Sequence, residues 1–121
     1  MKFDFQSEKP LYLQLKEQIE DAILNGAFAE ESQIPSTTEI SVTYQINPAT
    51  ALKGMNLLVE EGILYKKRGL GLFVSPQAIS GLKQKRSKAF YENYVIAMLE
   101  EARKLQISKE EILEMIRKEE K

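Results

Sequence analysis

A connection of only four residues, 44–47 (YQIN), joins two predicted helices and limits the folds open to this chain. Asn47 is a good N-cap, and Pro48 suits the first helical position, where its missing N–H costs nothing. Apolar residues then recur at helical spacing and predict a helix to about Glu61, just before Gly62. Two helices joined so tightly are expected to cross at a steep angle, as in a helix-turn-helix.

Two other local patterns precede this connection. Apolar residues at helical spacing predict a helix over about 10–25, with Pro10 at its first position. Ser36 and Glu39 form the pattern of a capping box, which predicts a short helix of about two turns after Pro35. The proline biases the residue before it toward an extended conformation, so residues 32–34 are expected to form a short strand.

Two short apolar runs follow the helices, at 63–65 (ILY) and 72–74 (LFV). Between them lies the segment KKRGLG, whose two glycines permit positive φ, so the pattern predicts a hairpin with a basic tip. Three helices and a hairpin in this order predict a mainly α fold with a small β-hairpin, the winged helix-turn-helix. We expect this domain to cover residues 1–76.

The remaining residues, 77–121, are predicted to form two C-terminal helices. One carries a wide apolar stripe over 89–105, and the second begins at Ser108, which forms another capping-box pattern with Glu111. The stripe could fold back on the first domain, but it is wider than a small domain would cover, and such patches usually find a partner. A two-fold homodimer is the commonest arrangement, with these residues in the dimerisation region: Phe90, Tyr94, Val95, Met98, Leu99 and Leu105.

Composition excludes several classes of function. The chain has no histidine and no cysteine, so the usual zinc sites and nucleophile–base pairs cannot form. We therefore expect no metal, no cofactor and no enzymatic activity. The sequence has no apolar run long enough to span a membrane and no apolar segment typical of a signal peptide, so we expect a cytoplasmic protein without a membrane partner.

Charge is unevenly distributed along the chain. The net charge is −1, but residues 62–91 contain seven basic residues and no acidic one. A local basic stripe of this kind can bind a polyanion even when the net charge is near zero. For residues 83–88 the competing interpretation is a solvated, lysine-rich linker. The seven basic residues are Lys66, Lys67, Arg68, Lys83, Lys85, Arg86 and Lys88.

Three segments, PLYLQLKEQIEDAILNGAF, IPSTTEIS and INPATALKGMNLLVEEGILYKKRGLGLFV, together resemble the GntR family of bacterial transcription regulators. The short tail makes the chain similar to the YtrA-type subfamily, which has a short helical dimerisation region in place of a large effector domain. The chain departs from the family where relatives often have arginines: these positions hold Thr38, Pro48 and Leu52. The resemblance implies a DNA-binding transcription regulator, most simply a repressor.

A recognition helix enters the major groove with its N-terminal residues forward, which directs attention to the first turns of the helix after Asn47. The sequence also leaves open that Ser36 and Asn47 act only as helix caps. Our candidate contacts to double-stranded DNA are Ser36, Thr37, Thr38, Asn47, Ala49, Thr50, Lys53, Lys67, Arg68 and Gly69. We expect a homodimer that binds an inverted-repeat operator. The alternative is a winged-helix protein-interaction module without DNA binding, because residues 1–76 carry a net charge of −3. Whether a small-molecule effector binds is left open.

Overall fold

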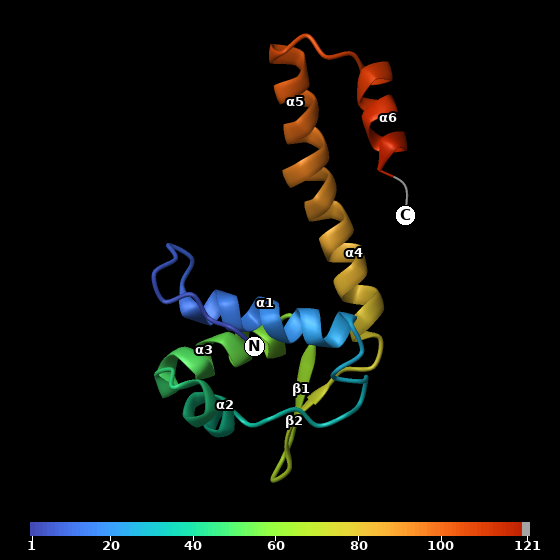
Figure 1. Ribbon diagram of the computed structural model, residues 1–121. Helices are drawn as coiled ribbons and strands as arrows, with labels where there is room; N and C mark the ends of the chain where they lie inside the picture. Colours follow the sequence, from blue (N-terminus) through green and yellow to red (C-terminus); the bar gives the residue numbers. More distant parts are fainter. Residues whose placement is uncertain (120–121) are drawn as a thin grey trace. The chain divides into compact units, whose positions relative to one another are not determined.

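The computed structural model describes residues 1–119, and these form two compact units, Met1–Lys83 and the chain from Gln84 onward. The first unit holds three helices and a two-stranded sheet (Figure 1): α1 (Leu11–Leu24), α2 (Thr37–Tyr44), α3 (Pro48–Glu60), β1 (Leu64–Lys67) and β2 (Gly71–Val74). The predicted winged helix-turn-helix, mainly α with a small hairpin, is confirmed. The first unit ends at Lys83, seven residues beyond the expected boundary at 76.

Local signals account for the ends of the helices. The Ser36 hydroxyl accepts a hydrogen bond from the Glu39 N–H, and the Glu39 carboxylate accepts one from the Ser36 N–H, each at 3.0 Å. Asn47 caps α3 through its side-chain oxygen, and Pro48 occupies the first helical position as expected. Pro10 instead lies one residue before α1, with an extended ψ of 146°.

The turn between α2 and α3 is fixed by its own hydrogen bonds. Gln45 takes a left-handed conformation, with φ at 54°, which ends α2 and turns the chain away from the helix axis. The following residue, Ile46, is buried, and its carbonyl accepts a hydrogen bond from the Ser41 hydroxyl at 2.7 Å. The turn is thus held by an apolar anchor and a buried hydrogen bond.

The hairpin pairs β1 with β2 antiparallel, with Tyr65 opposite Phe73. The strand expected at 32–34 is reduced to an isolated bridge between Gln33 and Phe73. The ladder stops there because Pro35 has no N–H and the N–H of Ser36 already donates to the helix cap.

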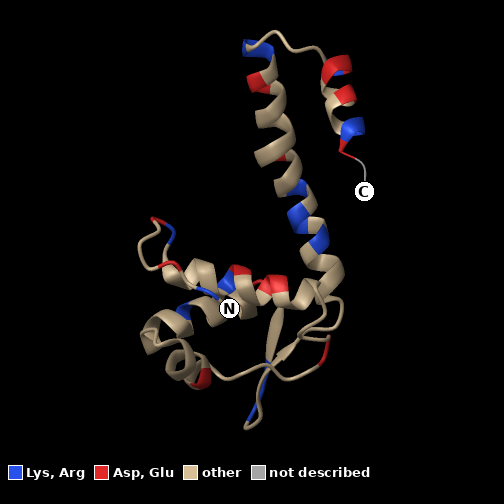
Figure 2. Ribbon diagram, viewed as in Figure 1, with Lys and Arg blue, Asp and Glu red and all other residues tan. Residues whose placement is uncertain are grey.

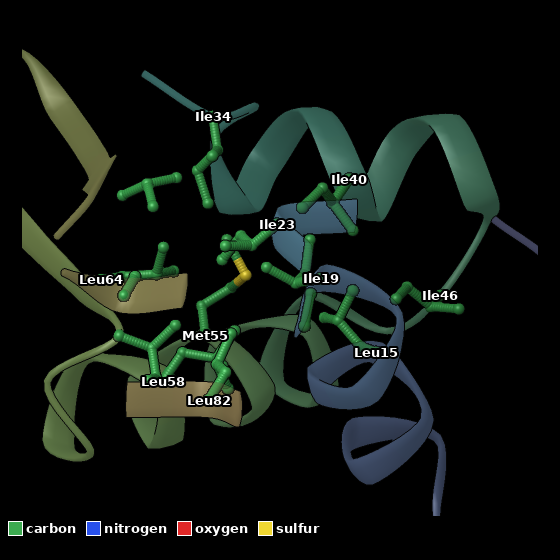
Figure 3. Packing of buried hydrophobic residues seen from close by; sticks show 14 residues of the cluster. Leu15, Ile19, Ile23, Ile34, Ile40, Ile46, Met55, Leu58, Leu64 and Leu82 are labelled. Carbon is green, nitrogen blue, oxygen red and sulfur yellow. The ribbon is translucent and has the colours of Figure 1, made fainter. Parts of the chain in front are cut away.

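The core of the first unit lies where α1, α2, α3 and the sheet meet (Figure 3). Met55 and Leu58 are fully buried, as expected for the inner face of α3. Ala78 and Leu82, at the start of α4 (Ala78–Phe90), are buried in the same cluster. Their burial explains why the first unit extends past residue 76.

Residues before α1 form an arm that sequence reasoning did not predict. The buried Gln14 side chain accepts a hydrogen bond from the Asp4 N–H at 2.8 Å and donates to the carbonyls of Asp4 and Lys9, each at 2.9 Å. The Phe3 ring contacts the Tyr44 ring edge-on, with 5.6 Å between centroids. These contacts tie the arm to α1 and to the end of α2.

The second unit is helical throughout its regular structure. Helix α4 is followed directly by a π-helical turn, η1 (Tyr91–Val95), and by α5 (Ile96–Lys104), and α6 (Lys109–Lys118) begins after Ser108 with the expected capping box. Residues 83–88, for which a solvated linker was the competing interpretation, lie within α4 and are mostly exposed, and the start of this helix is anchored by the buried Leu82. No helix within residues 1–119 is long and apolar enough to cross a membrane.

Candidate nucleic-acid interface

The first two turns of α3 present a small and weakly polar surface. Asn47 Oδ1 accepts a hydrogen bond from the Ala49 N–H at 2.8 Å, so its side chain is engaged in capping. Ala49 and Lys53 are exposed and Thr50 is half-buried, whereas Ala51 faces the core. Small side chains on the outer face allow a close approach to a ligand surface, and Thr50 and Lys53 supply the polar groups there.

Lys53 is held by a neighbour on α1. Its Nζ lies 4.0 Å from the centroid of the Tyr12 ring, a cation–π contact. The contact depends on a close crossing of the two helices: a Cβ built on Gly54 would lie only 2.8 Å from the Tyr12 carbonyl oxygen. Gly54 therefore lets α3 approach α1 closely enough for the ammonium group to reach the ring.

The start of α2 is already occupied by its own cap. Ser36 uses both its N–H and its hydroxyl in the hydrogen bonds with Glu39. The hydrogen bond from the Ser36 N–H, and after it the Ser36 side chain, hold the pKa of the Glu39 carboxylate below its ordinary value of 4.5. A carboxylate at this helix end opposes a phosphate at the same place. Because the Ser36 N–H and hydroxyl are already hydrogen-bonded, Thr37 (half-buried) and Thr38 (exposed) are better placed than Ser36 to contribute.

The hairpin presents its cations at an exposed tip, where Figure 2 shows basic residues. Lys67, Arg68 and Gly69 are all exposed, and Gly69 has φ at 78°. Lys67 Nζ lies 4.4 Å from the centroid of the Phe73 ring, and that ring pairs with Tyr65 at 5.9 Å. Both aromatic side chains are half-buried and support the lysine.

The acidic residues of the first unit lie elsewhere, in the N-terminal arm, in the loop after α1 and on its three helices, and none of them lies in the hairpin (Figure 2). Several are paired with lysines: Lys16 Nζ lies 3.0 Å from a Glu20 oxygen and 3.2 Å from a Glu61 oxygen, and Glu17 pairs with Lys9 at 2.7 Å. Burial lowers the pKa of Lys16, but its hydrogen bonds and attraction to the two carboxylates outweigh burial, and the net pKa is raised. The negative net charge of residues 1–76 is thus concentrated away from the hairpin tip.

The second unit carries the residues expected in the dimerisation region. Phe90, Tyr94, Met98 and Leu105 are exposed, and Val95 and Leu99 are half-buried. The rings of Phe90 and Tyr94 lie 5.7 Å apart. The helices of this unit thus leave apolar side chains exposed along their length, from Phe90 to Leu105.

An open apolar groove of about 410 Å³ lies between α5 and α6. Met98 and Leu105 contribute to it, together with residues that we did not assign to the interface from the sequence: Ala102, Ile107, Ile112, Met115 and Ile116. The α6 residues among them share one face of that helix, so the helical spacing of 112–116 was the signal that could have added them.

The model of bacterial regulatory proteins of the gntR family matches residues 11–74. The HTH-type transcriptional regulator YhcF of Bacillus subtilis is 32% identical over 115 residues, which cover 93% of this chain and 92% of YhcF. The HTH-type transcriptional repressor YtrA of the same organism is 31% identical over 78 residues, 64% of this chain and 60% of YtrA.

Solved structures agree with these matches. A GntR family transcriptional regulator from Listeria monocytogenes has a TM-score of 0.79 at 29% identity, over 96% of this chain and all of that one. The DNA-binding domain of AraR, solved in complex with its operator ORX1, has a TM-score of 0.55 at 31% identity. It matches 62% of this chain and 93% of that domain.

Proposed function

Because this chain belongs to the gntR family of bacterial regulatory proteins and is similar to its YtrA member, we propose that it is a homodimeric repressor of transcription that binds an inverted-repeat operator. That the chain is a DNA-binding regulator follows from its family; the proposal concerns the residues, the assembly and the direction of regulation. Two repressors among its relatives, YtrA and NagR of Bacillus subtilis, support repression.

The observation that carries the proposal is the outer face of α3. In this proposal α3 enters the major groove, and Thr50 offers a hydroxyl and a methyl group to a base edge or a phosphate. Lys53 reaches a guanine or a phosphate from the next turn. Its contact with Tyr12 restricts the side chain before DNA binds, which lowers the conformational entropy that binding costs.

The hairpin tip contributes mainly through charge. Lys67 and Arg68 neutralise phosphates beside the groove that α3 occupies, and Gly69 allows the backbone of the tip to come close to the DNA. None of the acidic residues of the first unit lies in the hairpin or in the first two turns of α3, so they do not argue for a protein-interaction module in place of DNA binding.

We assign Met1–Lys83, which includes the start of α4, to DNA binding, and the chain from Gln84 onward, in place of the expected 77–121, to dimerisation. The exposed aromatic pair Phe90–Tyr94 and the apolar groove between α5 and α6 support this assignment, because both would be covered by a second copy. A two-fold dimer reads a two-fold site, so the operator should be an inverted repeat.

The decisive test starts from operator DNA. Duplexes that the protein selects from a random-sequence pool should share an inverted repeat, and a footprint should cover both halves. A reporter gene placed behind that site should be less active when the protein is present. A selected site without internal symmetry, or a reporter that becomes more active, would contradict the proposal.

Dimerisation is tested with the full chain. The double variant Met98→Asp with Leu99→Asp places two charges in the apolar surface of the dimerisation region. Light scattering should then show a monomer at micromolar concentration. Affinity for the inverted repeat should fall by about 10²–10⁴, the gain that effective concentration supplies to two linked modules.

A matched control is the double variant Gln84→Asp with Ser87→Asp, which adds the same charge at exposed polar positions of α4. It should remain a dimer. If instead the Met98–Leu99 variant stays dimeric, the dimer surface lies elsewhere. A shortened chain used for comparison should end at Lys83, because a cut after Pro76 removes Ala78 and Leu82 from the core.

A further inference from the structure

The tip of the hairpin carries an exposed leucine between two glycines. Leu70 leaves 63% of its surface exposed, although it lies in a segment whose other large side chains are basic or half-buried. Gly69 and Gly71 on either side both have positive φ, at 78° and 119°. The glycines carry no side chains, so the residues directly before and after Leu70 do not cover its isobutyl group.

The backbone of Leu70 is held firmly. Its N–H donates to the Lys67 carbonyl at 2.9 Å, and its carbonyl accepts a hydrogen bond from Gln33 Nε2 at 2.5 Å. A Cβ built on Gly71 would come within 2.9 Å of the same Gln33 nitrogen. Gln33 thus lies against the tip and fixes the turn from a neighbouring segment, and the apolar side chain of Leu70 is left exposed.

An apolar side chain at this place has a specific consequence beside DNA. Lys67 and Arg68 bind phosphates and draw the tip toward a groove, and the minor groove, about 6 Å wide, admits single side chains from a narrow tip. A G·C pair there adds the N2 amino group of guanine to the groove floor. Leucine cannot accept a hydrogen bond from that group, so contact would crowd it and leave its donor unpaired, at a cost.

We propose that Leu70 is a specificity-determining residue that enters the minor groove beside each half-site and selects base pairs lacking the guanine N2 amino group. The inference rests on the proposed function, since it needs a protein that binds a specific operator. In this proposal the contacts of α3 select bases in the major groove, and Leu70 excludes G·C pairs from the adjacent minor groove. Gln33 positions the tip that carries Leu70.

The test uses a duplex selected by the protein itself from a random-sequence pool. The base pairs to be changed are those beside each half-site whose minor groove the protein protects in a footprint. They are prepared in three versions: A·T, G·C and I·C. Inosine keeps the major-groove face of guanine but lacks the N2 amino group, so it isolates that group. The full-length protein should bind the A·T and I·C duplexes equally and the G·C duplex about tenfold more weakly, within the usual cost of an unfavourable base pair.

Leu70→Ala should bind all three duplexes within about twofold of one another, with an unchanged dependence of affinity on salt, because no charge is lost. Gln33→Ala should weaken the discrimination in part. The control is Phe5→Ala, which removes an apolar side chain with the same 63% exposure from the N-terminal arm and should leave the tenfold preference intact.

Two results would overturn the proposal: equal binding of the G·C and I·C duplexes by the unmodified protein, or full discrimination retained by Leu70→Ala. Thermal unfolding of each variant confirms that the fold is intact, which is expected because Leu70 contributes little buried surface. A failure of the proposed function is seen separately, because then the random-sequence pool yields no inverted-repeat duplex at all.

Discussion

The close crossing of α1 and α3 at Gly54 makes a quantitative prediction. In Gly54→Ala the new methyl group would lie 2.8 Å from the Tyr12 carbonyl oxygen and 3.1 Å from Leu15 Cδ2. The carbonyl is part of the α1 backbone and cannot rotate away, so the helices must separate by a few tenths of an ångström. Overpacking of this kind costs about 1–3 kcal/mol. Alanine in place of glycine also stabilises the helix by about 1 kcal/mol through its higher helix propensity.

A matched control separates the two effects. Gly81 is also helical, but a Cβ built there meets no described heavy atom within 4 Å. Gly81→Ala should therefore stabilise the protein by about 1 kcal/mol, through propensity alone. The free energies of unfolding of the two variants should differ by about 1–3 kcal/mol, the steric cost at Gly54.

Urea unfolding followed by circular dichroism, at one protein concentration, measures this difference. With a slope of about 1–3 kcal/mol per molar urea, the two midpoints should lie roughly 1 M apart. If Gly54→Ala stabilises the protein as much as Gly81→Ala, then α1 and α3 do not cross as closely as described, and the support of Lys53 by Tyr12 is lost with it.

Three other predictions concern the DNA-facing residues. Thr50→Ala and Lys53→Ala should each weaken specific binding by about 1–3 kcal/mol in a gel-shift titration, and unchanged affinity for both would remove this face from the interface. Replacing Lys67 and Arg68 with alanine should weaken binding to all sequences alike and reduce the slope of log K against log salt by about 0.9 per lost phosphate contact; an unchanged slope would point to base contacts. The lowered pKa of Glu39 means that its carboxylate stabilises α2 fully above the unfolded pKa of about 4.5 and loses this effect as the pH falls through the folded value. Glu39→Gln should therefore lower the thermal midpoint at neutral pH and not in strong acid, and an equal effect at both would show that the charge is irrelevant.

Features set by neighbouring residues could be predicted from the sequence. The capping boxes at Ser36 and Ser108 and the proline at the start of α3 each depend on a few consecutive residues, and all three form as expected. The buried faces of α1 and α3 follow in the same way from helical spacing.

Features set by contacts between distant parts of the chain could not be predicted from the sequence. The first turns of α4 contain Gly81, which favours helix weakly, and the helix begins at Ala78 because its first residues are anchored. Leu82 enters the core, and Glu30 accepts a hydrogen bond from the Ile79 N–H, 49 residues along the chain.

The candidate site also contains features of both kinds, some set by neighbouring residues and some by distant contacts. That Asn47 and Pro48 start α3 could be predicted from the residues themselves, and this fixes which turns of the helix lead. The contacts made to Lys53 by Tyr12 and to Leu70 by Gln33 join segments far apart in the sequence, and no local pattern indicates them. The DNA contacts of these residues remain predictions.

The π-helical turn η1 has a consequence for how the tail of this chain is compared with its relatives. A turn closed by i→i+5 hydrogen bonds takes up one more residue than an α-helical turn. If one residue were deleted between Tyr91 and Val95, an unbroken α-helix could form, and side chains from Ile96 onward would keep nearly the same direction relative to those before the turn, because the wider π turn absorbs the extra residue. Two tails that differ by this single residue would then present the same faces to a partner, and aligning their sequences requires a one-residue gap within residues 91–95.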